Sequence, residues 1–187
     1  MFEDICHYKI LAALFTLYIP IVQDKLMLGD ILEQVSLFQG LTPAQLERIQ
    51  PMFKVIEGHT GSILFEQGDP AEFLYLVVSG EITIRYKPDD GSVIVVARVK
   101  PGGVVGWSAA LGNRVYTSGA LCTENSRLLR LRGRDLRKLC EDDSETGALI
   151  LDRLACIIAQ RLSHTHDQVV ALLKQGINNG TTAVRGG

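Results

Sequence analysis

The residues most able to do chemistry lie in one glycine-rich stretch, from Pro101 to Thr117. Gly102, Gly103 and Gly106 give the backbone freedom to turn, and the small residues after Trp107 can begin a helical turn. Consecutive backbone amides at such a turn attract an anion. Short glycine motifs are also common in tight strand connections that bind nothing. The pattern alone leaves both interpretations open.

Length, composition and charge limit the classes of function. A chain of 187 residues is long enough for one domain with a full core. A hydrophobic fraction of 47% with 21% charged residues is typical of a soluble globular protein. The net charge of -2 gives no basic field, so we expect no nucleic-acid partner. The widely spaced cysteines form no CxxC pair and indicate reduced thiols in a cytoplasmic protein: Cys6, Cys122, Cys140 and Cys156.

The N-terminal region contains an apolar run from Ile10 to Val22, which includes Thr16 and Pro20. A helix needs about 20 apolar residues to span a bilayer, so this run is too short. Acidic Glu3 and Asp4 follow Met1, which differs from the basic start of a signal peptide. We therefore expect residues 1–34 to be a helical extension that packs on the domain or a partner, and no membrane attachment.

The middle of the chain changes from helical to strand periodicity. Thr42, Pro43 and Gln45 form a typical helix start, with a cap, a proline at the first position and a capping-box glutamine. Asp90-Gly91 lies between two alternating runs and predicts a hairpin. The short runs rich in β-branched and aromatic residues are 54–56, 62–65, 73–78, 81–86, 92–99, 116–121 and 126–131. This spacing predicts a sandwich or barrel.

The C-terminal part reads as a short helix from Arg134 to Cys140 and a long helix that Ser144 begins and caps. An apolar stripe follows the long helix at steps of three and four: Leu151, Ala155, Ile158, Leu162, Val169 and Leu172 or Leu173. This stripe either covers the barrel or forms a dimer contact. We expect the β domain over 35–140, the helix over 141–175 and a flexible tail over 176–187.

Three segments carry a resemblance to a known family: residues 37–42 (LFQGLT), 61–69 (GSILFEQGD) and 73–82 (FLYLVVSGEI). They resemble the opening strands of the cyclic-nucleotide-binding domain family, as in catabolite-activator-like effector domains. The likeness extends over about residues 35–173. It implies a mainly β fold with flanking helices, a double-stranded β-helix (jelly roll) with N-terminal helices and a long C-terminal helix. It also implies a pocket closed by a phosphate-binding cassette at Pro101 to Thr117.

The cassette departs from the family pattern at its charged positions. The family usually has Phe-Gly-Glu-Leu-Ala-Leu, then an Arg about nine residues after the Glu; the Glu holds the ribose hydroxyl and the Arg the cyclic phosphate. In the aligned segment 105–110, Trp107 replaces the Glu, and Tyr116 replaces the Arg. A second alignment would use Arg114 as the phosphate ligand but needs a shortened cassette. We prefer the first because it keeps the strand at 126–129 in place without gaps.

The resemblance gives a set of candidate ligand-binding residues: Gly106, Trp107, Ser108, Ala109, Arg114, Tyr116 and Thr117. A charge-assisted hydrogen bond contributes about 1.5–3 kcal/mol, so losing two weakens an ordinary cyclic nucleotide strongly. The amides of residues 106–109, two hydroxyls and Arg114 remain as anion ligands. Trp107 either stacks on a ligand or fills the pocket. For Tyr116 we slightly favour the interpretation that it fills the pocket.

No catalytic or metal-binding motif stands beside the cassette. His7, His59, His164 and His166 have no ligand spacing, and no nucleophile or phosphate-loop motif is present. The residues after the long helix, 177–187, are too few for the helix-turn-helix domain of related transcription factors.

We therefore expect a stand-alone regulatory module, not an enzyme, that binds a cyclic nucleotide (cAMP or cGMP), weakly, or a related small anionic or aromatic ligand. We expect it to form a homodimer and to signal through an unidentified protein partner. The alternative is a ligand-free interaction module whose pocket is filled by Trp107 and Tyr116.

Overall fold

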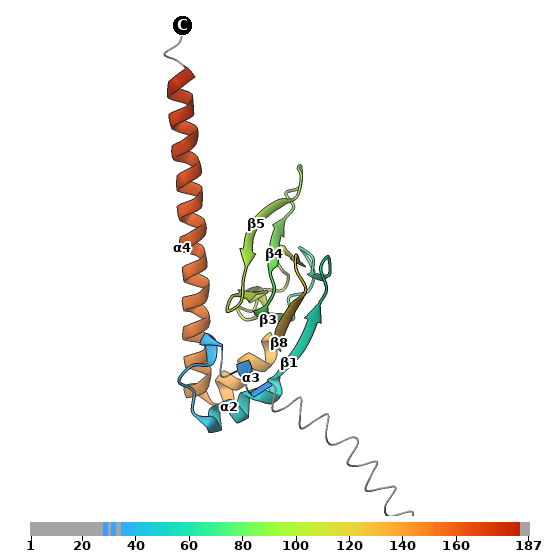
Figure 1. Cartoon of the computed structure of the whole chain (residues 1–187). Helices are drawn as coiled ribbons and strands as arrows, with labels where there is room; N and C mark the ends of the chain where they lie inside the picture. The colour runs from blue at the N-terminus through green and yellow to red at the C-terminus, as the bar shows by residue number, and fades with distance from the viewer. Residues whose placement is uncertain (1–27, 30, 33–34, 184–187) are drawn as a thin grey trace, which may run out of the picture.

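The computed structural model describes residues 28–29, 31–32 and 35–183 (Figure 1). Most of the expected helical extension over residues 1–34, including its apolar run, lies outside these residues. Leu28 and Leu32 are buried in the core, and a 3-10 turn, η1 (Ser36–Phe38), follows them. No helix in the described part of the chain has the length and hydropathy needed to cross a membrane.

The helix α2 (Pro43–Ile49) begins as its sequence predicts. The Thr42 hydroxyl accepts a hydrogen bond from the Gln45 amide at 3.3 Å, and the Gln45 side chain accepts one from the Thr42 amide at 2.9 Å. This reciprocal pair satisfies two amides that a helix start leaves without partners. A 3-10 turn, η2 (Gln50–Met52), connects α2 to the first strand.

The strands form two four-stranded antiparallel sheets, in the orders β1-β8-β3-β6 and β2-β7-β4-β5. Their bounds are β1 (Phe53–Gly58), β2 (Ile63–Phe65), β3 (Phe73–Ser79), β4 (Ile82–Tyr86), β5 (Ile94–Val99), β6 (Val104–Val105), β7 (Gly119–Cys122) and β8 (Ser126–Arg132). The jelly-roll prediction is confirmed, and the predicted hairpin at Asp90-Gly91 joins β4 to β5. The strand β6 was missed because two residues show no alternation.

The sheet that contains β8 is buried on both faces. Leu129 and Leu131 point to a core shared with the helices, whereas Leu128 points into the roll. Successive side chains of a strand alternate between faces, which explains the division. The inner core is closed by Phe65, Tyr75 and Tyr116, and the cassette is therefore built against an aromatic interior.

Two helices follow the roll: α3 (Gly133–Asp142) and α4 (Ser144–Ala183). The cap of α4 is Asp143, a correction of the prediction that Ser144 caps it. The Thr146 amide donates to Asp143 at 3.1 Å and the Thr146 hydroxyl at 2.8 Å, because a carboxylate reaches both donors. These bonds, with a smaller contribution from Arg48, lower the pKa of Asp143. The structure continues α4 to Ala183, past the boundary expected at residue 176.

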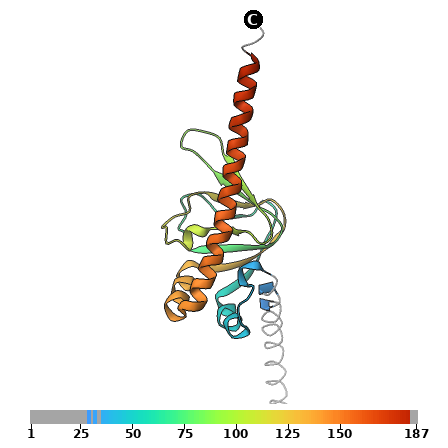
Figure 2. The same cartoon turned by 90° about the vertical axis from the view of Figure 1, so that its left-hand side faces the viewer.

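Some apolar residues of α4 face the rest of the domain, and others face solvent. Ile150 and Leu154 are 2% exposed and pack on the roll and α3, whereas Leu151 is 40% and Leu162 58% exposed. Ala155 is also exposed, and Ile158 is partly buried. The side chains of Val169, Leu172 and Leu173 lie outside those described. In both views α4 extends past the roll (Figures 1 and 2).

Candidate functional site

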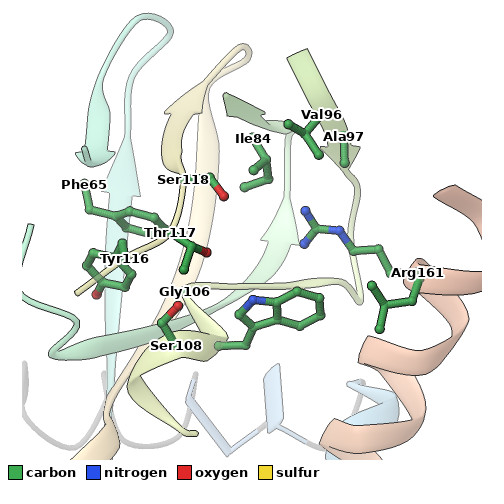
Figure 3. A pocket seen from close by; sticks show the side chains of 12 residues that line it. Phe65, Ile84, Val96, Ala97, Gly106, Ser108, Tyr116, Thr117, Ser118 and Arg161 are labelled. Carbon is green, nitrogen blue, oxygen red and sulfur yellow. The ribbon is translucent and has the colours of Figure 1, made fainter. Parts of the chain in front are cut away.

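A cavity of about 140 Å³ lies between the inside of the roll and α4. We call it the Trp107 cavity. Figure 3 shows its walls: strand and loop residues on one side, and Arg161 reaching in from α4 on the other. The lining residues are Phe65, Ile84, Val96, Ala97, Gly106, Trp107, Ser108, Tyr116, Thr117, Ser118, Arg161 and Leu162.

Gly106 forms the turn at the base of the cavity. Its φ of 75° lies in the left-handed region, which only glycine adopts without strain. A Cβ here would come within 2.6 Å of the Phe73 carbonyl oxygen and 3.3 Å of the Phe65 and Tyr116 rings. The glycine therefore allows a close approach of the chain to the aromatic interior. The turn leads directly into the short 3-10 segment η3 (Trp107–Ala109).

Tyr116 is part of the core as well as of the cavity wall. Its ring stacks on Phe65 with centroids 3.7 Å apart and planes at 17°. Its hydroxyl accepts a hydrogen bond from the Phe73 amide at 2.9 Å and donates one to the Phe73 carbonyl at 2.7 Å. Burial raises the pKa of Tyr116 to about 12. The phenol is thus neutral at ordinary pH, and its polar atom is occupied by the backbone.

Trp107 and Arg161 form the opposite wall. Trp107 is half-buried, and the Arg161 guanidinium carbon lies 5.3 Å from the centroid of its ring. Arg161 also donates to the Val104 carbonyl at 3.2 Å, and burial lowers its pKa. Arginine side chains stay protonated in proteins, so the group is a desolvated cation at the cavity.

Arg161 was missed in the sequence, although its helix carries a signal for it. Leu154, Ile157 and Arg161 follow one another at steps of three and four residues, which places the arginine on the buried face of α4. A charged residue on an apolar helical face is rarely buried without a polar purpose. The apolar walls from Phe65, Ile84, Val96 and Ala97 were missed because no local pattern links them.

Only some of the other candidate residues lie at the cavity. Ser108 and Thr117 line the cavity, whereas Ala109 and Arg114 do not. The Ala109 carbonyl accepts a hydrogen bond from Arg137 at 3.0 Å, on the α3 side. The Ala109 amide donates to Gly106 at 3.1 Å, which leaves it unavailable to an anion.

The position of Arg114 bears on the choice between the two alignments of the cassette. Arg114 is exposed, and Tyr116 occupies the cavity wall instead. This placement favours the alignment of Tyr116 with the family arginine.

The size of the Trp107 cavity limits what it can hold as it stands. Binding pockets for drug-sized ligands have volumes of about 300–1,000 Å³. A cavity of about 150 Å³ accommodates benzene, so the present volume of about 140 Å³ suits one small ring. A complete nucleotide therefore requires the wall formed by Arg161 and Leu162 to move outward.

Metal and thiol chemistry have little geometric basis in the described residues. No group of three or more His, Cys, Asp or Glu side chains there is arranged to hold a metal ion. Cys122, Cys140 and Cys156 are free, and burial raises the pKa of the first two thiols, which makes them less reactive.

Comparison with known proteins finds the same fold and a similarity to one family. Residues 56–143 match the family described as the cyclic nucleotide-binding domain. A putative cyclic nucleotide-binding protein from Geobacter metallireducens is 27% identical with a TM-score of 0.63, over 72% of this chain and 97% of that one. The Thermus thermophilus catabolite activator protein is 28% identical with a TM-score of 0.59, over 74% and 62%.

A curated relative is the CRP-like cAMP-activated global transcriptional regulator of Mycobacterium tuberculosis, 23% identical over 78% of this chain and 63% of its own length. The chain thus spans less than two thirds of the length of that regulator. The matched residues include the cassette and the strands that hold it. On this evidence residues 56–143, which make up most of the β-roll, are similar in sequence and fold to the cyclic nucleotide-binding domain family.

Proposed function

We propose that this chain is a regulatory, non-enzymatic ligand sensor of the cytoplasm whose Trp107 cavity binds a cyclic nucleotide, cAMP or cGMP, or a related small anionic aromatic ligand. The observation that carries the proposal is the pairing of a desolvated cation, Arg161, with an aromatic ring, Trp107, in one cavity beside the cassette. An aromatic ring can stack on a base, and a guanidinium can hold a phosphate.

Arg161 and Trp107 supply a positive charge and a stacking surface in place of the Glu and Arg that the cassette lacks. A hydrogen bond from Arg161 to a phosphate contributes about 1.5–3 kcal/mol. Stacking of a base on an aromatic side chain contributes about 1–3 kcal/mol. Moving the outer wall offsets part of this gain, because the ligand has to displace the bond from Arg161 to the Val104 carbonyl. The expected affinity is therefore weaker than that of a charged cassette.

We expect the signal to pass through α4, the helix that carries Arg161. A ligand phosphate competes with the Val104 carbonyl for the guanidinium, so binding changes the contact between α4 and β6. Leu151, Ala155 and Leu162 then offer an outward apolar stripe for a second copy of α4. Edge strand β5 adds exposed Val95 and Val96 beside α4. We place a homodimer and the contact with a protein partner on this side.

The test uses Trp107 itself, because it is the only tryptophan in the chain. Its fluorescence is followed while cAMP and cGMP are added up to millimolar levels. We expect a saturable change with one of them, and about tenfold weaker binding for Arg161→Gln, which corresponds to about 1.4 kcal/mol.

The matched control is Arg153→Gln. Arg153 lies on the same helix and donates to the Leu37 carbonyl at 3.3 Å, away from the cavity. Its binding curve should equal that of the original chain. No fluorescence change and no thermal stabilisation by either nucleotide would contradict the cyclic-nucleotide proposal.

The second candidate function is a ligand-free interaction module, favoured by the small cavity and by the full engagement of the Tyr116 hydroxyl. Under this alternative Trp107 is a filler, and Trp107→Ala lowers the melting temperature without any gain or loss of ligand response. Analytical ultracentrifugation then tests the partner surface. Leu151→Glu, at an exposed position outside the cavity, should dissociate a dimer that forms on α4, whereas Glu145→Gln, at the start of the helix, should not.

A further inference from the structure

Half of the residues that line another cavity, of about 350 Å³, are cationic. It shares no lining residue with the Trp107 cavity. We call it the arginine cavity, and its walls are Pro51, Met52, Lys54, Phe73, Arg130, Arg132, Arg134 and Asp135. Four cations face one carboxylate there, although the whole chain has a net charge of -2.

The strand register brings three of the cations together. Lys54 on β1 is the direct partner of Arg130 on β8, and Arg132 lies two residues along the same strand. Residues two apart on a strand share one face, and like charges at opposed positions destabilise a sheet. The sheet therefore carries an electrostatic cost at this point, which an anion between the three side chains would remove.

Phe73 orients the two guanidinium groups. The carbon of the Arg130 guanidinium lies 4.5 Å from the centroid of the Phe73 ring, and that of Arg132 lies 5.3 Å from it. A guanidinium held over an aromatic ring keeps its N–H edges free for a planar or tetrahedral anion. The Phe73 ring thus holds two guanidinium groups at the same cavity.

The nearby carboxylates do not neutralise this cluster. Asp135 pairs with Arg134 at 3.5 Å. Glu72 is close enough to influence the neighbouring Tyr75, whose hydroxyl also bonds Arg130. Among the ion pairs of the described residues, none involves Lys54, Arg130 or Arg132. Three positive charges therefore remain at the cavity.

We propose that the arginine cavity binds a phosphate group that carries at least two negative charges, such as a phosphomonoester or a diphosphate. Arg130 and Arg132 supply paired N–H donors, and Lys54 supplies a point charge opposite them. This site is separate from the proposed nucleotide site and does not depend on it. The phosphate belongs either to a soluble molecule or to a lipid headgroup.

Titration calorimetry of the full chain with pyrophosphate tests the soluble source. Arg132→Gln is the informative variant, because Arg132 is exposed and its replacement leaves the core intact. We expect at least tenfold weaker binding. Arg127→Gln is the matched control: it lies on the same strand, pairs with Glu57 at 2.8 Å and is outside the cavity, so its binding should be unchanged.

Flotation with phosphatidylcholine vesicles that contain phosphatidic acid tests the lipid source with the same variants. Binding to either probe that Arg132→Gln weakens and Arg127→Gln preserves supports the proposal and identifies the source. Absence of binding to both probes overturns it, as does an equal loss in the two variants. Arg161→Gln should leave pyrophosphate binding unchanged, which separates this result from the outcome at the Trp107 cavity.

Discussion

The two walls of the Trp107 cavity are held by different kinds of contact. On the roll side, Tyr116 stacks on Phe65 and bonds both polar atoms of the Phe73 backbone. On the helix side, Arg161 makes one described hydrogen bond to a carbonyl and a contact with the Trp107 ring. The first wall is part of the core, whereas the second is attached to it through Arg161 and the packing of α4.

This difference indicates where stability and ligand response reside. Changes on the roll side should lower the free energy of unfolding, because they break buried contacts. Changes on the helix side should affect ligand binding with little loss of stability. The predictions below test this division, beginning with the largest expected effect.

Gly106→Ala should destabilise the protein most. The left-handed backbone costs a residue with a Cβ about 1–2 kcal/mol, and repacking an overfilled core adds about 1–3 kcal/mol. Gly102→Ala is the matched control, because its φ is 85° and a Cβ there meets no atom within 4 Å. Denaturant unfolding should show the larger loss for Gly106→Ala; equal losses would mean that the roll-side wall is not tightly packed.

Tyr116→Phe should lower the free energy of unfolding by about 1–3 kcal/mol, because it leaves the partly buried amide and carbonyl of Phe73 without the tyrosine hydroxyl. Tyr86→Phe serves as the control, since Tyr86 is 42% exposed. Both variants are compared by urea unfolding. A negligible effect of Tyr116→Phe would show that the roll-side wall contributes as little to stability as the helix-side wall.

The pH dependence of stability gives an independent measure of the same contact. The pKa of Tyr116 rises from 10.0 to about 12 in the folded protein, so folding favours the neutral phenol. This stabilisation is complete below pH 10 and is lost as the pH rises through 12. Over this interval the stability of the original chain should fall more steeply than that of Tyr116→Phe, which spectroscopic unfolding at each pH can measure.

Arg161→Gln should have the smallest effect on stability, about 1 kcal/mol, because its ring contact and its hydrogen bond to a carbonyl are each weak. Its thermal unfolding should stay close to that of Arg153→Gln. A loss as large as that of Tyr116→Phe would show that α4 depends on this residue, and the two walls would then not differ in kind.

The fold was largely predictable from the sequence because its signals are local. The Thr42 capping box, the Asp90-Gly91 hairpin and the alternating strand runs each depend on neighbouring residues. Asp143 shows the limit of such signals: Ser144 and Asp143 are both good caps, and the choice depended on which oxygens reach Thr146. A one-residue shift of a helix start cannot be read from preference alone.

Of the residues that line the cavity, only those within the cassette were predictable from the sequence. Gly106, Trp107, Ser108, Tyr116 and Thr117 line the cavity because they follow one another along the chain. Arg161 lies on α4, which begins at Ser144 after the roll has ended at Arg132, and its approach to Trp107 is a result of tertiary packing. The ligand-binding role of all these residues stays a prediction.

The bond between Tyr116 and Phe73 also limits which residues position 116 can accept. An arginine there would place a charge between the Phe65 ring and the partly buried backbone of Phe73, and would leave that backbone without its hydroxyl partner. A cationic cassette residue at this position therefore requires that its aromatic surroundings change with it.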